Sequence, residues 1–167
     1  MNDVIKYSFL FIILLLIQVV VLNNILFSGY INPFLYILFI IVFPLMRDRG
    51  LILVLSFLLG LFVDFFLDSG GINAAATLAI AYLRLPLLKG LLRKSDIDFL
   101  VFNITKLPFT KLLSYIAILT FTHHLIVFSL EYFKLSEILT ILSRTILTGI
   151  FTFILIIFSL LLMNKSK

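Results

Sequence analysis

The residues of this chain that could do chemistry are a few polar and charged side chains inside long apolar runs. Ser56, Gly60, Asp64 and Asp68 recur every four residues, which places them on one slowly drifting face of a helix. An ionisable group at depth in a bilayer is costly, and by default it marks a functional site or an ion pair. Asp64 is therefore the first residue whose partner the fold must supply.

Two other apolar runs carry similar seams of small and polar residues. One seam holds Asn73, Ala75, Thr77, Ala79 and Ala81, and the other holds Thr140, Arg144, Thr148, Gly149 and Thr152. Small residues let helix backbones approach closely in lipid, where the hydrophobic effect does not drive helices together. We interpret these seams first as helix-packing surfaces, and as ligand-binding surfaces only second.

The sequence gives little sign of catalysis. His123 and His124 are adjacent, so on a helix they point about 100° apart and cannot bind one metal as a pair spaced by four residues does. The chain has no cysteine, no glycine-rich phosphate loop and no serine-centred nucleophile motif. We expect no enzyme activity, no cofactor and no metal.

Composition indicates the elements that position these residues. Of the 167 residues, 63% are hydrophobic and 13% charged, and the mean hydropathy is +1.27, whereas about a quarter of the residues in a soluble domain are charged. Six runs are long enough to cross a bilayer as helices: 7–22, 30–46, 51–67, 72–88, 112–130 and 138–163. We predict an all-α integral membrane protein with six transmembrane helices in one bundle, a single domain over residues 1–167. Little chain remains for a soluble or nucleic-acid-binding domain.

The basic residues predict the orientation. Eleven of the 13 lie at the termini or in the connections after the second and fourth runs: Lys6, Arg47, Arg49, Arg84, Lys89, Arg93, Lys94, Lys106, Lys111, Lys165 and Lys167. The other connections contain only Lys134, and Arg144 lies within the last run. The positive-inside rule then places both termini in the cytoplasm. Residues 89–111 are either a segment lying on the inner membrane surface or a turn packed against the bundle.

Asp64 and Arg144 are predicted to lie at the same depth. Each is about 10 Å below the outer edge of a core about 30 Å thick, by the rise of 1.5 Å per helical residue. An ion pair would limit the cost of burying both charges. Arg144 could instead extend to the outer headgroups, or pair with Asp68 or Glu131.

The stretch from residue 22 to 84 resembles a known family. Gly29-Tyr30-Ile31-Asn32-Pro33 leads into an apolar run, Gly60-Leu61-Phe62-Val63-Asp64 follows, and then come Asp68-Ser69-Gly70-Gly71-Ile72-Asn73 and an alanine-rich run ending at Arg84. This order of motifs resembles the bacterial rod shape-determining protein family MreD. The remainder of the chain is similar to that family only in size, number of spans and hydrophobicity.

The resemblance implies a non-enzymatic component of the elongasome in the bacterial cytoplasmic (inner) membrane. Such a protein would bind MreC and, through the wider assembly, act with MreB filaments, RodA and its penicillin-binding partner in lateral cell-wall synthesis. No nucleic acid and no small-molecule substrate is expected. The alternative is the substrate-binding subunit of an energy-coupling-factor vitamin transporter, also a six-span bundle, in which Asp64, Asn73 and Arg144 would line an outward-facing pocket.

The short outer connections leave few places for contact with MreC. We expect the contact on span surfaces or on the apolar rim at residues 25–34, with Phe27 and Tyr30 as candidate partner-binding residues. Replacing both with serine should weaken co-purification with MreC and leave the protein in the membrane.

Overall fold

The fold is taken from a computed structural model that describes residues 3–25, 31–45, 49–93, 104 and 107–165. Along the chain the helices are α1 (Asp3–Leu16), extended by a π-helical turn (Ile17–Val21) and a 3₁₀ turn (Leu22–Asn24), then α2 (Ile37–Val42), α3 (Gly50–Leu67), α4 (Ile72–Leu92), α5 (Phe109–Tyr132) and α6 (Ile138–Lys165). A 3₁₀ turn, Leu135–Glu137, precedes α6. The described part of the chain is thus built from helices and their connections.

Five of the helical segments are long and apolar enough to cross a membrane. They span Asp3–Asn24, Gly50–Leu67, Ile72–Leu92, Phe109–Tyr132 and Ile138–Met163. Each coincides with one of the runs predicted from hydropathy, with ends shifted by a few residues. The chain is therefore a multi-pass helical membrane protein.

The remaining predicted run, the second along the chain at residues 30–46, is not a transmembrane helix. Within its described part, residues 31–45, the α-helix is α2, which has six residues and is flanked by non-helical backbone. We call residues 31–45 the central segment. At about 1.5 Å per residue, α2 is about 9 Å long, far less than the ~30 Å of a hydrocarbon core. Hydropathy failed here because a buried core segment and a lipid-facing helix have similar composition.

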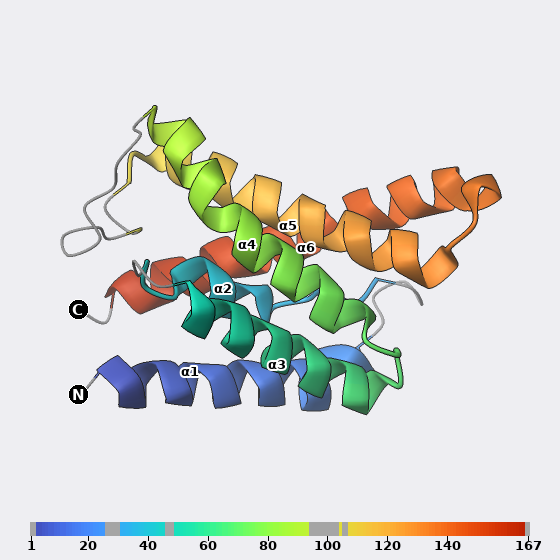
Figure 1. The fold of residues 1–167 in the computed structure, drawn as a ribbon, viewed down its shortest axis with the longest axis horizontal. Coiled ribbons are helices and arrows are strands. Elements are labelled where there is room, and N and C mark those ends of the chain that lie inside the picture. The colour runs from blue at the N-terminus through green and yellow to red at the C-terminus, as the bar shows by residue number, and fades with distance from the viewer. Residues whose placement is uncertain (1–2, 26–30, 46–48, 94–103, 105–106, 166–167) are drawn as a thin grey trace.

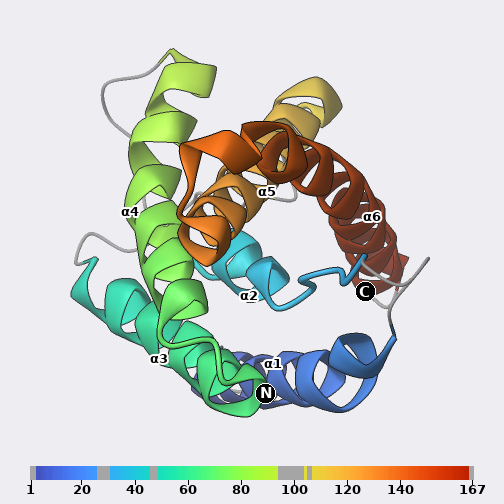
Figure 2. The ribbon, with the colours of Figure 1, turned by 90° about the vertical axis from the view of Figure 1, so that its right-hand side faces the viewer.

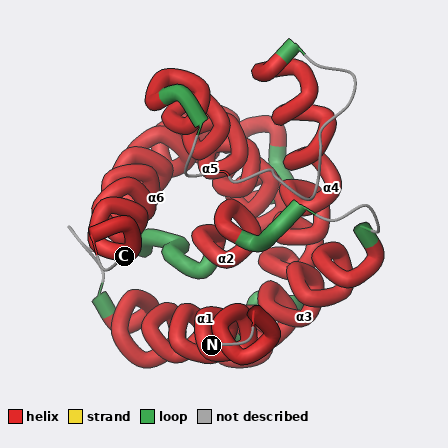
Figure 3. The backbone as a smooth tube through the Cα atoms, turned by 90° about the vertical axis from the view of Figure 1, so that its left-hand side faces the viewer, coloured by secondary structure: helices red, strands yellow, loops and turns green. Residues whose placement is uncertain are grey.

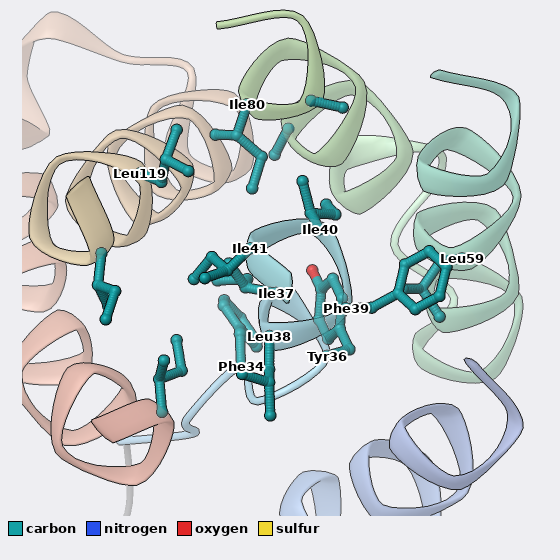
Figure 4. Close-up of a cluster of buried hydrophobic side chains, with 14 of the residues drawn as sticks. Phe34, Tyr36, Ile37, Leu38, Phe39, Ile40, Ile41, Leu59, Ile80 and Leu119 are labelled. Atoms are coloured by element: carbon teal, nitrogen blue, oxygen red, sulfur yellow. The ribbon is translucent and has the colours of Figure 1, made fainter. Parts of the chain in front are cut away.

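The central segment is enclosed by the other helices. Figures 2 and 3 show α1, α3, α4, α5 and α6 arranged around α2. Tyr36, Ile37, Leu38, Phe39, Ile40 and Ile41 are at most 2% exposed, and they form the centre of the core together with Leu59, Ile80 and Leu119 (Figure 4). In Figure 1, α1 begins and α6 ends at the same end of the molecule, which also holds the start of α3 and the end of α4. We call the opposite end the outer end.

Candidate functional site

Asp64 is buried at the outer end of α3 and binds the first turn of α4. One carboxylate oxygen, Oδ2, accepts a hydrogen bond from the Ala74 backbone N–H at 2.8 Å. The other, Oδ1, accepts from the backbone N–H and the Nδ2 of Asn73, both at 2.9 Å, and from Ser69 Oγ at 2.5 Å. The first backbone N–H groups of a helix have no partner within the helix, and the positive end of the helix dipole favours an anion there. Asp64 is therefore the N-terminal cap of the next helix.

Close packing of α3 on α4 makes this cap possible. A Cβ on Gly60 would lie 2.6 Å from both Ala74 Cα and the Asn73 carbonyl oxygen, so only glycine fits at this position. The turn between the two helices uses left-handed backbone at Asp68, Gly70 and Gly71, with φ values of 53°, 64° and 93°. These contacts fix the helices as one unit, which we call the α3–α4 hairpin.

A hydrogen-bond chain connects the hairpin to the centre of the bundle. The Asp64 carboxylate can only accept, so Asn73 Nδ2 faces it and Asn73 Oδ1 faces Tyr36, whose hydroxyl donates at 2.7 Å. The Tyr36 oxygen is then left to accept from His123 Nε2, at 3.0 Å. In the described part of the chain, His123 Nδ1 is buried and has no hydrogen-bond partner. Tyr36 thus connects α4 and α5 through the central segment.

His124 joins α5 to α6 and to the same segment. Its Nδ1 lies 2.8 Å from the Thr120 carbonyl oxygen, which can only accept, so Nδ1 carries a proton. In the neutral ring Nε2 then accepts from Thr152 Oγ1, at 3.0 Å. Thr152 Oγ1 in turn accepts from the Phe34 backbone N–H at 3.0 Å. The two adjacent histidines therefore have separate structural roles, and within the described ranges no group of residues is suited to hold a metal ion.

Two further side chains satisfy the non-helical backbone of the central segment. Gln18, in the π-helical turn after α1, donates from Nε2 to the Pro33 carbonyl at 3.0 Å. Arg84 donates from Nη2 to the Phe43 carbonyl at 2.5 Å. Irregular backbone at membrane depth is tolerated where protein groups satisfy it.

The structure corrects the interpretation of Arg84. The sequence placed this residue among the basic residues of a cytoplasmic connection, yet it lies inside α4 and is only 2% exposed. It serves the backbone of the central segment, so it does not belong in the count of loop charges.

A cavity of about 300 Å³ opens beside the hairpin at the outer end. We call it the outer cavity. Its polar lining residues are Asn32, Ser69, Asn73, Glu131 and Arg144, and its apolar ones are Phe34, Leu67, Ile72, Val127 and Phe128. The lining comes from the central segment, α4, α5, α6 and the end of α3. A concave site with an apolar wall and a few convergent polar groups is typical of small-molecule binding.

The expected ion pair between Asp64 and Arg144 is not formed in the structure. The four hydrogen bonds of the Asp64 carboxylate come from Ser69, Asn73 and Ala74. The Arg144 guanidinium lies 5.4 Å from the centre of the Tyr132 ring. The carboxylate of Asp64 instead accepts hydrogen bonds from backbone, hydroxyl and amide donors at a helix end. The prediction from equal depth in the bilayer was wrong because it considered only charged partners. Asn73 and Arg144 both line the outer cavity.

The other seam residues divide into buried and exposed groups. Ser56, Thr77 and Thr148 are buried, and a Cβ on Gly149 would lie 2.7 Å from the Phe121 ring. Asp68 is exposed at the end of α3, Ala75 is exposed, and Ala79 is partly buried. The pair Ala75 and Ala79 is therefore not the packing face of α4. Asn73, Ala74, Thr77 and Ala81 are buried instead, since they share the face that bears on α3 and the core.

Some predicted features fall outside the described residues. Phe27 and Tyr30 do, and so does most of residues 89–111. Their roles in partner binding and at the membrane surface stay predictions.

Sequence reasoning missed Gln18, Arg84 and Thr152 as supports of the central segment, and it missed the buried hydroxyl of Tyr36 within that segment. The available signal was that Gln18 and Arg84 are isolated polar residues within apolar helices. Comparison with known proteins adds no assignment: no protein-family model, no curated protein and no solved structure matches this chain.

Proposed function

We propose that this protein is a non-enzymatic scaffold of the bacterial cell-shape machinery, similar in role to MreD, which binds MreC in the cytoplasmic membrane. The proposal is supported by what the motif residues of the resemblance do in the structure. Gly60, Asp64, Ser69, Gly71 and Asn73 are the residues that build the α3–α4 hairpin. A motif that specifies such a unit is a sign of a shared fold, because neither glycine nor a buried cap tolerates replacement.

The proposed topology has six crossings. We take the central segment as the crossing between α1 and α3, since both termini then lie on the cytoplasmic side with most of the basic residues. In this topology the outer cavity faces the periplasm.

Affinity purification and depletion in the source cell test the scaffold role. The tagged protein, extracted in mild detergent, should recover MreC, and depletion should turn rods into spheres. The Phe27→Ser, Tyr30→Ser double variant should recover less MreC, whereas Tyr82→Ser serves as a control because Tyr82 is an exposed aromatic residue of α4. Rod shape that persists after depletion, with no recovery of MreC, would contradict the proposal.

A second candidate role is the substrate-binding subunit of a vitamin transporter. It is favoured by the outer cavity, which Asn73 and Arg144 both line. The two roles predict different partners. The transporter role requires co-purification with a transport ATPase module, whereas the scaffold role requires co-purification with MreC.

A further inference from the structure

The outer cavity contains two opposite charges that do not neutralise each other. Glu131, near the end of α5, and Arg144, on α6, both line it. No ion pair joins them in the part of the chain that the structure describes, where Arg144 instead lies against the Tyr132 ring. Among the described residues, the cavity wall thus carries a cation, Arg144, and a carboxylate, Glu131, that are not paired with each other.

The remaining polar groups of the wall narrow the choice of ligand. Ser69 and Asn73 already donate to Asp64, and Asn73 Oδ1 accepts from Tyr36. Asn32 differs, because its Oδ1 is buried and without a hydrogen-bond partner among the described residues. Among the described residues, the groups left to bind a ligand are thus one donor, the Arg144 guanidinium, and two acceptors, the Glu131 carboxylate and the Asn32 side-chain oxygen Oδ1.

We propose that the outer cavity binds a small zwitterion that carries a primary ammonium group and an acidic group. The acidic group pairs with Arg144, and the ammonium group donates to Glu131 and Asn32. A simple anion would face Glu131 and a simple cation would face Arg144, so either alone leaves a repulsive contact. Phe34, Val127 and Phe128 supply an apolar wall for the rest of the molecule.

Two sources offer this chemistry: a free amino acid, or the ethanolamine headgroup of a phospholipid. The volume of about 300 Å³ is at the small end of the range for ligand pockets. It therefore suits a molecule of this size better than a large cofactor. The inference concerns the cavity alone and does not depend on the scaffold role.

Isothermal titration of the full-length protein in detergent tests the proposal for free ligands, with leucine and phosphoethanolamine as zwitterions. Isovalerate and isoamylamine, which keep the side chain of leucine but only one charge each, are the matched ligand controls. We expect at least one zwitterion to bind, and each single-charge analogue of leucine to bind at least about tenfold more weakly than leucine if leucine is the ligand. For the lipid source, native mass spectrometry of nanodiscs should show retention of phosphatidylethanolamine over phosphatidylcholine, whose quaternary ammonium cannot donate.

The variants Glu131→Gln and Arg144→Gln should each weaken binding at least about tenfold, since each removes one charged hydrogen bond. Glu131 is exposed, so its variant keeps the test valid even if Arg144→Gln fails to fold. Asp68→Asn and Lys134→Gln remove charges at the same end without touching the cavity, and binding should not change. The proposal is overturned if neither zwitterions nor phosphatidylethanolamine bind, or if Glu131→Gln binds as the unaltered protein does.

Discussion

The α3–α4 hairpin and the central segment are held by hydrogen bonds of similar length, but the bonded residues are close in sequence in the hairpin and far apart in sequence in the central segment. In the hairpin, Asp64 binds groups 5 to 10 residues away. In the central segment, Phe34 binds a residue 118 positions away, Tyr36 one 87 away and Phe43 one 41 away. The hairpin can form as soon as two consecutive helices meet, whereas the central segment requires most of the chain. The two regions should therefore respond differently to mutation.

The largest effect should come from Gly60→Ala in the hairpin. The added methyl group would lie 2.6 Å from backbone atoms of α4, which cannot move without separating the helices. We expect a loss of about 3 kcal/mol in stability and a sharp fall in folded protein, measured by fluorescence-detected size exclusion after heating. Gly90→Ala is the matched control, because nothing lies within 4 Å of its Cβ position. Equal stability of the two variants would show that the close approach of α3 and α4 at Gly60 does not limit stability.

Next in size is Asp64→Asn. The amide keeps one acceptor oxygen but places an NH₂ group against backbone donors, so about 2–3 kcal/mol should be lost. Asp68→Asn is an isosteric control at an exposed position, and asparagine tolerates its left-handed backbone. The same heating assay compares the two variants. If the Asp64 cap stabilises the fold, only the Asp64 variant should be less stable than the unaltered protein.

Thr152→Val probes the central segment. It leaves the Phe34 N–H and His124 Nε2 unsatisfied, at a cost of about 2 kcal/mol. Thr145, on the same helix, has a buried hydroxyl with no hydrogen-bond partner among the described residues, so Thr145→Val should be neutral or stabilising. Similar thermal midpoints for the two variants would mean that Thr152 does not support the segment.

Tyr36→Phe should have the smallest effect, about 1 kcal/mol. It removes the hydroxyl that joins Asn73 to His123 and leaves the packing of the ring unchanged. A double-mutant cycle with His123→Phe sharpens the comparison, since coupled residues lose less together than the sum of the single losses. Strictly additive losses would show that the chain of hydrogen bonds does not act as a unit. Tyr82→Phe, at an exposed position, controls for loss of a hydroxyl as such.

The sequence separation of the bonded residues explains what the sequence could and could not predict. Five long helices followed from hydropathy, and the seam through Ser56, Gly60 and Asp64 correctly marked the face of α3 that becomes buried. The central segment did not follow, because its apolar composition matches that of a spanning helix and its supports are scattered over α4, α5, α6 and the π-helical turn after α1. The partners of Asp64 were missed because two of them are backbone N–H groups at the start of α4, and backbone groups cannot be recognised from residue types in the sequence.

Residues 31–45 cross the bundle as a short helix with non-helical flanks, and cysteine labelling tests this crossing directly. The chain contains no cysteine, so single cysteines at Asn24, Arg49, Asp68 and Lys134 can be labelled in intact cells with a membrane-impermeant maleimide. We expect labelling of the cysteines at positions 24, 68 and 134 in intact cells, and labelling at position 49 only after the cells are opened. Labelling of Asn24 and Arg49 from the same side would contradict the crossing.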